Sequence, residues 1–217
     1  YQGVPLSQID GSNSKTNCWD GIVVSGGGSV IAGLAVTGFS GSGILVTGPG
    51  GNDVVSNYVG LSPGTFSAAP NGVGIQVLGS AGNTIGGKGV QGNVVSGNAG
   101  IGVLVARVNP GDSSGNLIVG NWIGTDAAGA ARVPNGRDGV RFSGINASQI
   151  TGNVISGNLG NGVALLDQST AVLIVGNVVG LTSDGRSILA NGGDGVLVDG
   201  SPSNIIGGSD PDQANQI

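Results

Sequence analysis

The stretch NLIVGNWIGTD at residues 116–126 determines the fold, because related versions of it recur along the chain. Residues 52–60 read NDVVSNYVG and residues 172–180 read VLIVGNVVG, so the same order of apolar residues, asparagine and glycine returns. A shorter version stands between them, GNVVSGN at residues 92–98 and GNVISGN at residues 152–158. Because the apolar residues are mostly β-branched and are bounded by Gly, Asn and Ser, each copy predicts short β-strands separated by turns.

A second motif, glycine followed by an alternating apolar run, lies between the copies of the first. It starts at Gly21, Gly43, Gly74, Gly102, Gly139, Gly162 and Gly195, with spacings of 22, 31, 28, 37, 23 and 33 residues. A repeat of this length that holds three short strands and three turns is typical of one coil of a parallel β-helix. We therefore predict an all-β, single-stranded solenoid of about seven to eight coils, in which short and long coils alternate. Val103, Val105, Val140, Phe142, Ile118 and Ile123 are expected to point inward.

Asparagines recur at two places in the predicted coil. One set follows the second strand: Asn57, Asn93, Asn121, Asn153 and Asn177. The other set precedes the next Gly-Val or Gly-Ile: Asn71, Asn98, Asn135, Asn158 and Asn191. Asparagine tolerates the left-handed conformation of sharp turns, and stacked asparagines can hydrogen-bond from one layer to the next. We predict two asparagine ladders; the alternative is that these residues only mark loops.

The composition excludes several classes of function. The 217 residues include 47 glycines and no histidine, only 9% are charged, and the net charge is −5. An acidic chain with so few cations is unsuited to binding nucleic acid. Without histidine there is no Ser-His-Asp triad and no His-ligated zinc. No run of 18 apolar residues is present, so membrane insertion is not expected.

These motifs resemble those of bacterial right-handed parallel β-helix repeat proteins of the pectate-lyase-like superfamily. The stretches that carry the resemblance are residues 116–126, 152–158 and 204–208, and the similarity extends over essentially the whole chain. It implies a right-handed β-helix of a secreted or cell-surface bacterial protein. The superfamily includes polysaccharide lyases, hydrolases, epimerases and non-enzymatic adhesins, so the resemblance is specific for fold and not for activity. We expect residues 1–217 to be one segment of a longer chain, with a partial coil at 1–20 and a truncated coil at 195–217.

Two outward rows of the predicted strands are apolar. Val23, Leu45, Leu104 and Leu197 belong to the first row, and Tyr58, Val94, Trp122, Val154 and Val178 form the second. Contiguous apolar rows on a surface are typical of an interaction site. We predict an interface with other copies or flanking segments of the protein. The alternatives are that long loops of the same chain cover the rows, or that β-branched residues simply suit strands.

Few residues are candidates for chemistry. Asp167, Asp199 and Arg141 are the catalytic candidates, because the two aspartates lie at strand ends about one coil apart and Arg141 is outward on the neighbouring strand. Asp126 and Asp184 occupy the same place in two long loops and are the candidates for Ca²⁺, although recurrence favours turn-stabilising hydrogen bonds. Cys18 would be a free thiol or pair outside this segment. No cofactor is expected.

Taken together, these features predict a non-catalytic structural or adhesive β-helix that assembles through its apolar rows. The alternative is a carbohydrate-active or carbohydrate-binding β-helix, in which case the partner would be a polysaccharide and Tyr58 and Trp122 would be available for stacking against sugars.

Overall fold

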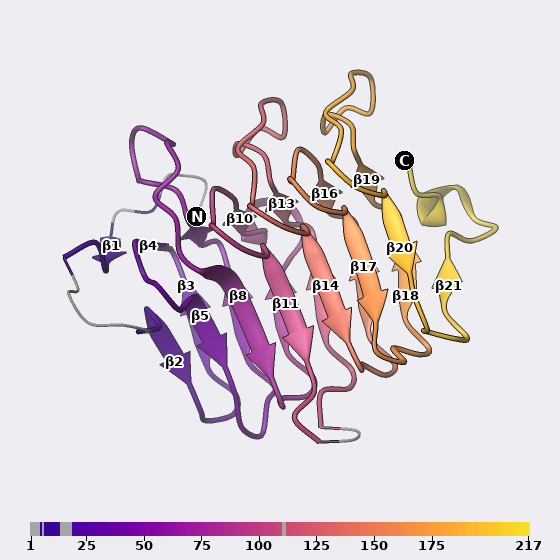
Figure 1. Cartoon of the computed structure of the whole chain (residues 1–217), viewed down its shortest axis with the longest axis horizontal. Helices are drawn as coiled ribbons and strands as arrows, with labels where there is room; N and C mark the ends of the chain where they lie inside the picture. The colour runs from indigo at the N-terminus through magenta and orange to yellow at the C-terminus, as the bar shows by residue number, and fades with distance from the viewer. Residues whose placement is uncertain (1–4, 6, 14–18, 110–111) are drawn as a thin grey trace.

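A computed structural model describes residues 5, 7–13, 19–109 and 112–217, and these form three parallel sheets of seven strands each (Figure 1). Sheet A contains β1 (Ser7–Asp10), β4 (Leu34–Thr37), β7 (Tyr58–Val59), β10 (Val94–Val95), β13 (Trp122–Ile123), β16 (Val154–Ile155) and β19 (Val178–Val179). Sheet B contains β2 (Ile22–Val24), β5 (Ser42–Val46), β8 (Val73–Leu78), β11 (Val103–Ala106), β14 (Val140–Ser143), β17 (Val163–Leu166) and β20 (Val196–Val198). Sheet C contains β3 (Val30–Ala32), β6 (Asp53–Val55), β9 (Thr84–Gly86), β12 (Leu117–Val119), β15 (Gln149–Thr151), β18 (Leu173–Val175) and β21 (Ile205–Ile206).

Each strand pairs in parallel with the equivalent strand of the next coil, which confirms the predicted solenoid; of the seven to eight coils expected, the structure has about seven. In sheet C, for example, Ile118 lies opposite Ile85 on one side and Ile150 on the other. Two short 3-10 turns, η1 (Gly89–Gln91) and η2 (Pro211–Gln213), are the only helical elements among the described residues. No helix among the described residues is long and apolar enough to cross a bilayer.

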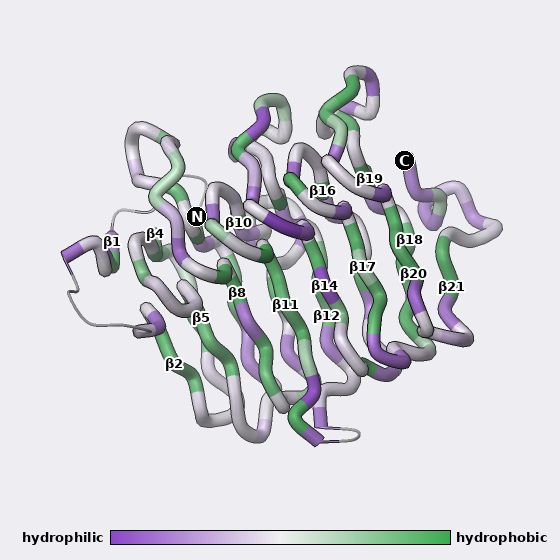
Figure 2. Tube along the Cα trace, viewed as in Figure 1, coloured by the Kyte–Doolittle hydropathy of each residue, from purple (hydrophilic) through white to green (hydrophobic). Residues whose placement is uncertain are grey.

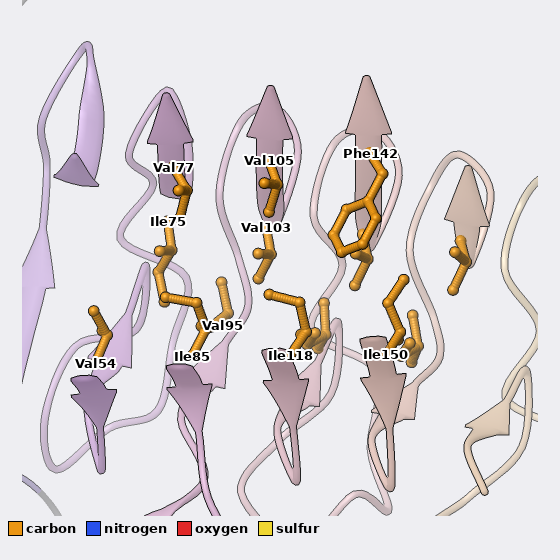
Figure 3. Packing of buried hydrophobic residues seen from close by; sticks show 14 of the residues in the cluster. Val54, Ile75, Val77, Ile85, Val95, Val103, Val105, Ile118, Phe142 and Ile150 are labelled. Carbon is orange, nitrogen blue, oxygen red and sulfur yellow. The ribbon is translucent and has the colours of Figure 1, made fainter. Parts of the chain in front are cut away.

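The core is a stack of aliphatic side chains along the axis of the solenoid. Figure 3 shows one column of Val54, Ile85, Ile118 and Ile150 from sheet C facing residues of sheet B, among them Phe142. All six residues that the sequence predicts to be inward are fully buried. Each buried side chain of this size contributes about 1.5–3 kcal/mol relative to an exposed one. Because the inward position repeats in every coil, the core is continuous from end to end.

Three long loops leave the solenoid on the same side, where sheet A turns into sheet B (Figure 1). Each folds back on itself through an antiparallel bridge, Leu61 to Ala68, Thr125 to Arg132 and Leu181 to Ile188. Figure 2 shows hydrophobic residues following the strands, whereas the turns at the opposite edge are largely pale or hydrophilic. The loops therefore account for the long coils, which alternate with short coils as predicted.

Candidate functional site

The first asparagine ladder lies at the turn between sheets C and A. The side-chain amide of Asn121 donates to Oδ1 of Asn153 at 3.0 Å and to the carbonyl oxygen of Ile85 at 2.8 Å. Its own Oδ1 accepts from the backbone N–H and the side-chain amide of Asn93, at 3.0 and 2.9 Å. The same pattern runs from Asn57 through Asn177 and reaches Asn215, one coil beyond the predicted set.

The second ladder lies at the turn between sheets A and B and is also confirmed. It connects Asn71, Asn98, Asn135, Asn158 and Asn191 by amide-to-oxygen bonds of 2.9–3.0 Å. The described residues contain no buried side-chain nitrogen or oxygen that lacks a hydrogen-bond partner. Both ladders therefore satisfy their buried polar groups and fix one coil upon the next.

Sequence reasoning missed a third ladder, at the residue that precedes each strand of sheet C. Asn52 donates to Asn83 at 3.0 Å, and Asn83 donates to Asn116 at 2.9 Å. Ser148 then takes the place of asparagine, and its hydroxyl accepts from the N–H of Asn116. Val172 interrupts the column before Asn204 resumes it by accepting from the N–H of Val172 at 2.9 Å.

The outer face of sheet B carries the first apolar row. Val23 is 58% exposed, and Leu45, Leu104 and Leu197 are half-buried. Gln76 and Arg141 are the polar members of the row, and Ala164 is buried between Arg141 and Leu197, its partners in register. We call this row, Val23, Leu45, Gln76, Leu104, Arg141, Ala164 and Leu197, the sheet B row. Its larger apolar members are accessible to a partner.

Long loops partly cover the second row, on sheet A. The ring of Phe66, on the first loop, lies 6.1 Å from the ring of Tyr58. Gly129, on the second loop, is so close that a side chain there would touch the indole of Trp122. Val94 is 2% exposed, and in register it lies between Tyr58 and Trp122.

Coverage by the protein's own loops, one of the three alternatives, therefore applies to this row. The prediction that Val94 belongs to an exposed row is corrected, because its side chain is buried and offers no free surface. Tyr58, Trp122, Val154 and Val178 keep partial exposure, so their part in an interface remains a prediction.

Arg141 forms an ion pair with a carboxylate that the sequence candidates did not include. Its Nε donates to Oδ2 of Asp138 at 2.7 Å, and a second guanidinium nitrogen contacts the same oxygen. Asp138 is buried, and its Oδ1 accepts from the backbone and side-chain amides of Asn161 at 2.9 and 3.0 Å. Both oxygens of this carboxylate are thus occupied by groups of the chain.

Asp167 and Asp199 do not occupy equivalent positions. The register of sheet B pairs Leu165 with Val198 and therefore places Asp199 opposite Leu166. Asp167 follows Leu166 in the chain, so it lies one residue beyond the position opposite Asp199. Asp167 has a left-handed backbone, with φ 56°, and accepts a hydrogen bond from the hydroxyl of Ser143. The two aspartates are therefore offset by one residue in neighbouring coils, and their catalytic role stays a prediction.

Asp126 and Asp184 act as turn-stabilising groups. Oδ1 of Asp126 accepts from the N–H groups of Ala130 and Ala131 at 2.8 and 3.1 Å. Oδ1 of Asp184 accepts from the hydroxyl of Thr182 at 2.6 Å and from the N–H of Arg186 at 3.1 Å. These bonds, the Thr182 hydroxyl first, hold the pKa of the Asp184 carboxyl below its ordinary value because they favour its charged form.

Within the part of the chain that the structure describes, no three Asp, Glu, Cys or His side chains gather into a group that could hold a metal ion. Cys18 lies outside the described residues.

Comparison with known proteins identifies the fold. No curated protein matches the chain. A solved structure of a mutant of the periplasmic alginate epimerase AlgG has a TM-score of 0.58 and 16% sequence identity, and the match covers 91% of this chain and 53% of that one. A second AlgG structure has 15% identity, a TM-score of 0.40 and the same coverage. The chain therefore spans about half the length of these epimerase chains, and at such low identity the likeness concerns the fold alone.

A family model described as "right handed beta helix region" matches residues 5–179, which is most of the chain. This match agrees with the three stacked parallel sheets and with the handedness that the motifs predict. The chain belongs to the right-handed β-helix family.

Proposed function

We propose that the chain is a non-catalytic structural β-helix of a secreted or cell-surface bacterial protein, and that it assembles with other copies through the sheet B row. The observation that carries this proposal is the exposure of large apolar side chains along one outer sheet face. Val23 is 58% exposed, and Leu45, Leu104 and Leu197 keep part of their surface. Soluble monomers seldom present such a row.

The geometry of the face suits lateral packing. Sheets pack face to face about 10 Å apart when their facing side chains interdigitate. Leu78 and Leu166, one pleat further along β8 and β17, are also half-buried and widen the apolar surface. Burying a leucine side chain contributes about 1.5–3 kcal/mol, so a few of these contacts are enough to favour association.

A double substitution of Leu45→Lys and Leu104→Lys tests this proposal. We expect the unchanged chain to associate reversibly in sedimentation velocity and the double variant to associate at least about tenfold more weakly, a difference of ~1.4 kcal/mol. The matched control replaces Leu117 and Leu173, half-buried outward leucines of sheet C, by lysine and should leave association unchanged. A chain that stays monomeric at every concentration, or a control that weakens association equally, contradicts the proposal.

A second candidate function is the binding of an anionic polysaccharide. Three arginines lie around β11 and β14 in a chain of net charge −5: Arg107 and Arg137, which are exposed, and Arg141, which is half-buried. Guanidinium groups bind carboxylates through paired hydrogen bonds. Because the fold is similar to that of an alginate epimerase, alginate is the polysaccharide with which we test this candidate. It concerns binding rather than turnover, because Asp138 beside Arg141 is fully occupied.

Affinity electrophoresis in gels that contain alginate tests the second candidate. We expect the unchanged chain to be retarded at low salt, and the double variant Arg107→Ala with Arg137→Ala to lose most of that retardation. Arg186→Ala, on the third long loop, removes the same charge elsewhere and serves as the control. Equal mobility in alginate gels and in gels with a neutral glucan contradicts polysaccharide binding.

A further inference from the structure

The sheet B row has a symmetric order of polarity across five neighbouring strands, β5, β8, β11, β14 and β17 (Figure 1). The parallel register places these residues side by side in the order Leu45, Gln76, Leu104, Arg141 and Ala164. Neighbouring strands lie about 4.8 Å apart, so the positions are evenly spaced. Leu104 is at the centre of the five, with one polar residue on each side and one aliphatic residue beyond each polar residue.

A second copy of the chain can face this row through a twofold axis in two ways. An axis along the solenoid makes the two rows parallel, so each residue faces its own counterpart. An axis along the strands makes the rows antiparallel, and the strand over which the axis passes decides which residues meet. In the parallel arrangement Arg141 faces Arg141 of the second copy, and like charges placed opposite each other disfavour association. The charge of Arg141 therefore favours antiparallel rows.

The same charge selects the position of the axis. When the axis passes over Leu104, that residue faces itself, and Arg141 faces the side chain of Gln76. Moving the axis by half a strand or by one strand places Arg141 against an aliphatic residue or against its own counterpart. A guanidinium group without an acceptor loses hydrogen bonds to water when it is covered. Only the axis over Leu104 gives Arg141 a polar partner on the row.

Gln76 and Arg141 have the hydrogen-bonding capacity for this contact. Oε1 of Gln76 accepts from the hydroxyl of the buried Ser42 at 2.8 Å, which orients the side chain and uses one of the two lone pairs of this oxygen. The Nε and one terminal nitrogen of Arg141 contact Asp138, and among the described residues no group is bonded to the other terminal nitrogen. The Arg141 side chain is 27% exposed. Its remaining N–H groups can therefore donate to Oε1 of Gln76 in a second copy.

We propose that the partner of the sheet B row is a second copy of the chain, related by a twofold axis that runs along the strands and passes over Leu104. Leu104 packs on its counterpart, and Arg141 of each copy donates to Gln76 of the other. Leu45 faces Ala164, the smallest residue of the row, so a large side chain meets a small one. This inference rests on the proposed function, because it requires association through the row, and it adds the partner and its orientation.

Single cysteines and a short bismaleimide cross-linker test the orientation. Cys18, the only cysteine of the chain, is first replaced by serine. We expect Leu104→Cys alone to give a covalent dimer, because position 104 faces itself. Leu45→Cys alone should give none, because its two copies lie four strands apart, about 19 Å. A mixture of Leu45→Cys chains and Ala164→Cys chains should give the covalent dimer again.

A charge substitution tests the polar contact without a cross-linker. Gln76→Glu keeps an acceptor for Ser42 and places a carboxylate opposite Arg141 of the second copy. We expect this variant to associate about threefold or more tightly in sedimentation velocity, because the twofold axis makes the charged contact twice. The matched control is Gln149→Glu on the outer face of sheet C, which adds the same charge at an exposed position and should not strengthen association.

Sedimentation velocity of the cysteine chains before cross-linking separates this inference from the proposed function. If the chains associate but Leu104→Cys does not cross-link, or Leu45→Cys cross-links alone, the twofold arrangement is wrong and association through the row still stands. If Gln76→Glu associates no more tightly than Gln149→Glu, Arg141 does not face Gln76 and the arrangement is again wrong. Chains that stay monomeric at every concentration contradict the proposed function and the arrangement together.

Discussion

Replacing Asn121 by alanine is expected to lower the free energy of unfolding by about 3–5 kcal/mol, because the side chain completes several buried hydrogen bonds at once. The N–H of Asn93 loses its acceptor, and the carbonyl oxygen of Ile85 loses a donor. The amide bond to Asn153 is lost as well. Each buried polar group left without a partner costs about 1–3 kcal/mol. Urea unfolding followed by circular dichroism measures the loss.

The control is Asn146→Ala, since Asn146 is exposed in a turn and should change stability by less than about 0.5 kcal/mol. Asn121→Asp refines the test, because aspartate keeps an acceptor for Asn93 but cannot donate to Ile85 or Asn153 when it is charged. Burial raises the pKa of a carboxyl, so this variant should gain stability as the pH falls through that raised value. An Asn121→Ala chain as stable as Asn146→Ala would mean that the ladder is not needed for stability.

The strands and two of the ladders could be predicted from sequence because both obey a period. The Gly-Val motif and the two asparagine sets that begin at Asn57 and Asn71 recur once per coil. Because each coil carries them in the same order, the coils can stack in one register. The third ladder escaped because its column is mixed. Asparagine at 52, 83, 116 and 204 is replaced by Ser148 and Val172 in between. The signal was still present, since every member directly precedes a strand of sheet C.

The coverage of the sheet A row could not be predicted, because loop paths depend on contacts between distant residues. Ser183 of the third loop donates its hydroxyl to the carbonyl oxygen of Ala128 in the second loop, 55 residues away in sequence. Its N–H donates to Gly129 at 2.9 Å. No local pattern specifies that two loops will meet across the short coil between them. Gly129, where the two loops meet, also lies against the indole of Trp122, so the partial exposure of Trp122 depends on the loop paths as well as on strand alternation.

The partner of Arg141 lies within local reach, three residues earlier at Asp138. Aspartate recurs just before the Gly-Val motif, at Asp138 and Asp194, and Asp138 accepts a hydrogen bond from the N–H of Asn161. The other carboxylate oxygen of Asp138 accepts a hydrogen bond from Arg141. This contact depends on the direction in which the side chains point at the start of β14, which the sequence pattern does not specify. A repeat thus predicts backbone and core well, because these are the same in each coil. It predicts surface chemistry poorly, because that differs from coil to coil.

A Gly50→Ala substitution is expected to lower the free energy of unfolding by about 2–5 kcal/mol, because it combines backbone strain with a collision. Gly50 has φ +92°, and a side chain there would run into the carbonyl oxygen of Ala81 in the next coil. That oxygen accepts a hydrogen bond from the N–H of Gly51 at 3.0 Å, so moving it away breaks a contact between coils. Chemical denaturation again gives the magnitude.

Two neighbouring glycines separate the causes. Gly26 has neither a left-handed backbone nor any atom within 4 Å of the added group, so Gly26→Ala should be neutral or stabilise by up to about 1 kcal/mol. Gly28 has φ +70° with open space, so Gly28→Ala should cost about 1–2 kcal/mol from backbone strain alone. If Gly50→Ala costs no more than Gly28→Ala, the coils have room to separate and glycine serves only the turn conformation. A clearly larger cost means that glycine also sets how closely successive coils approach, which is a second reason for 47 glycines in 217 residues.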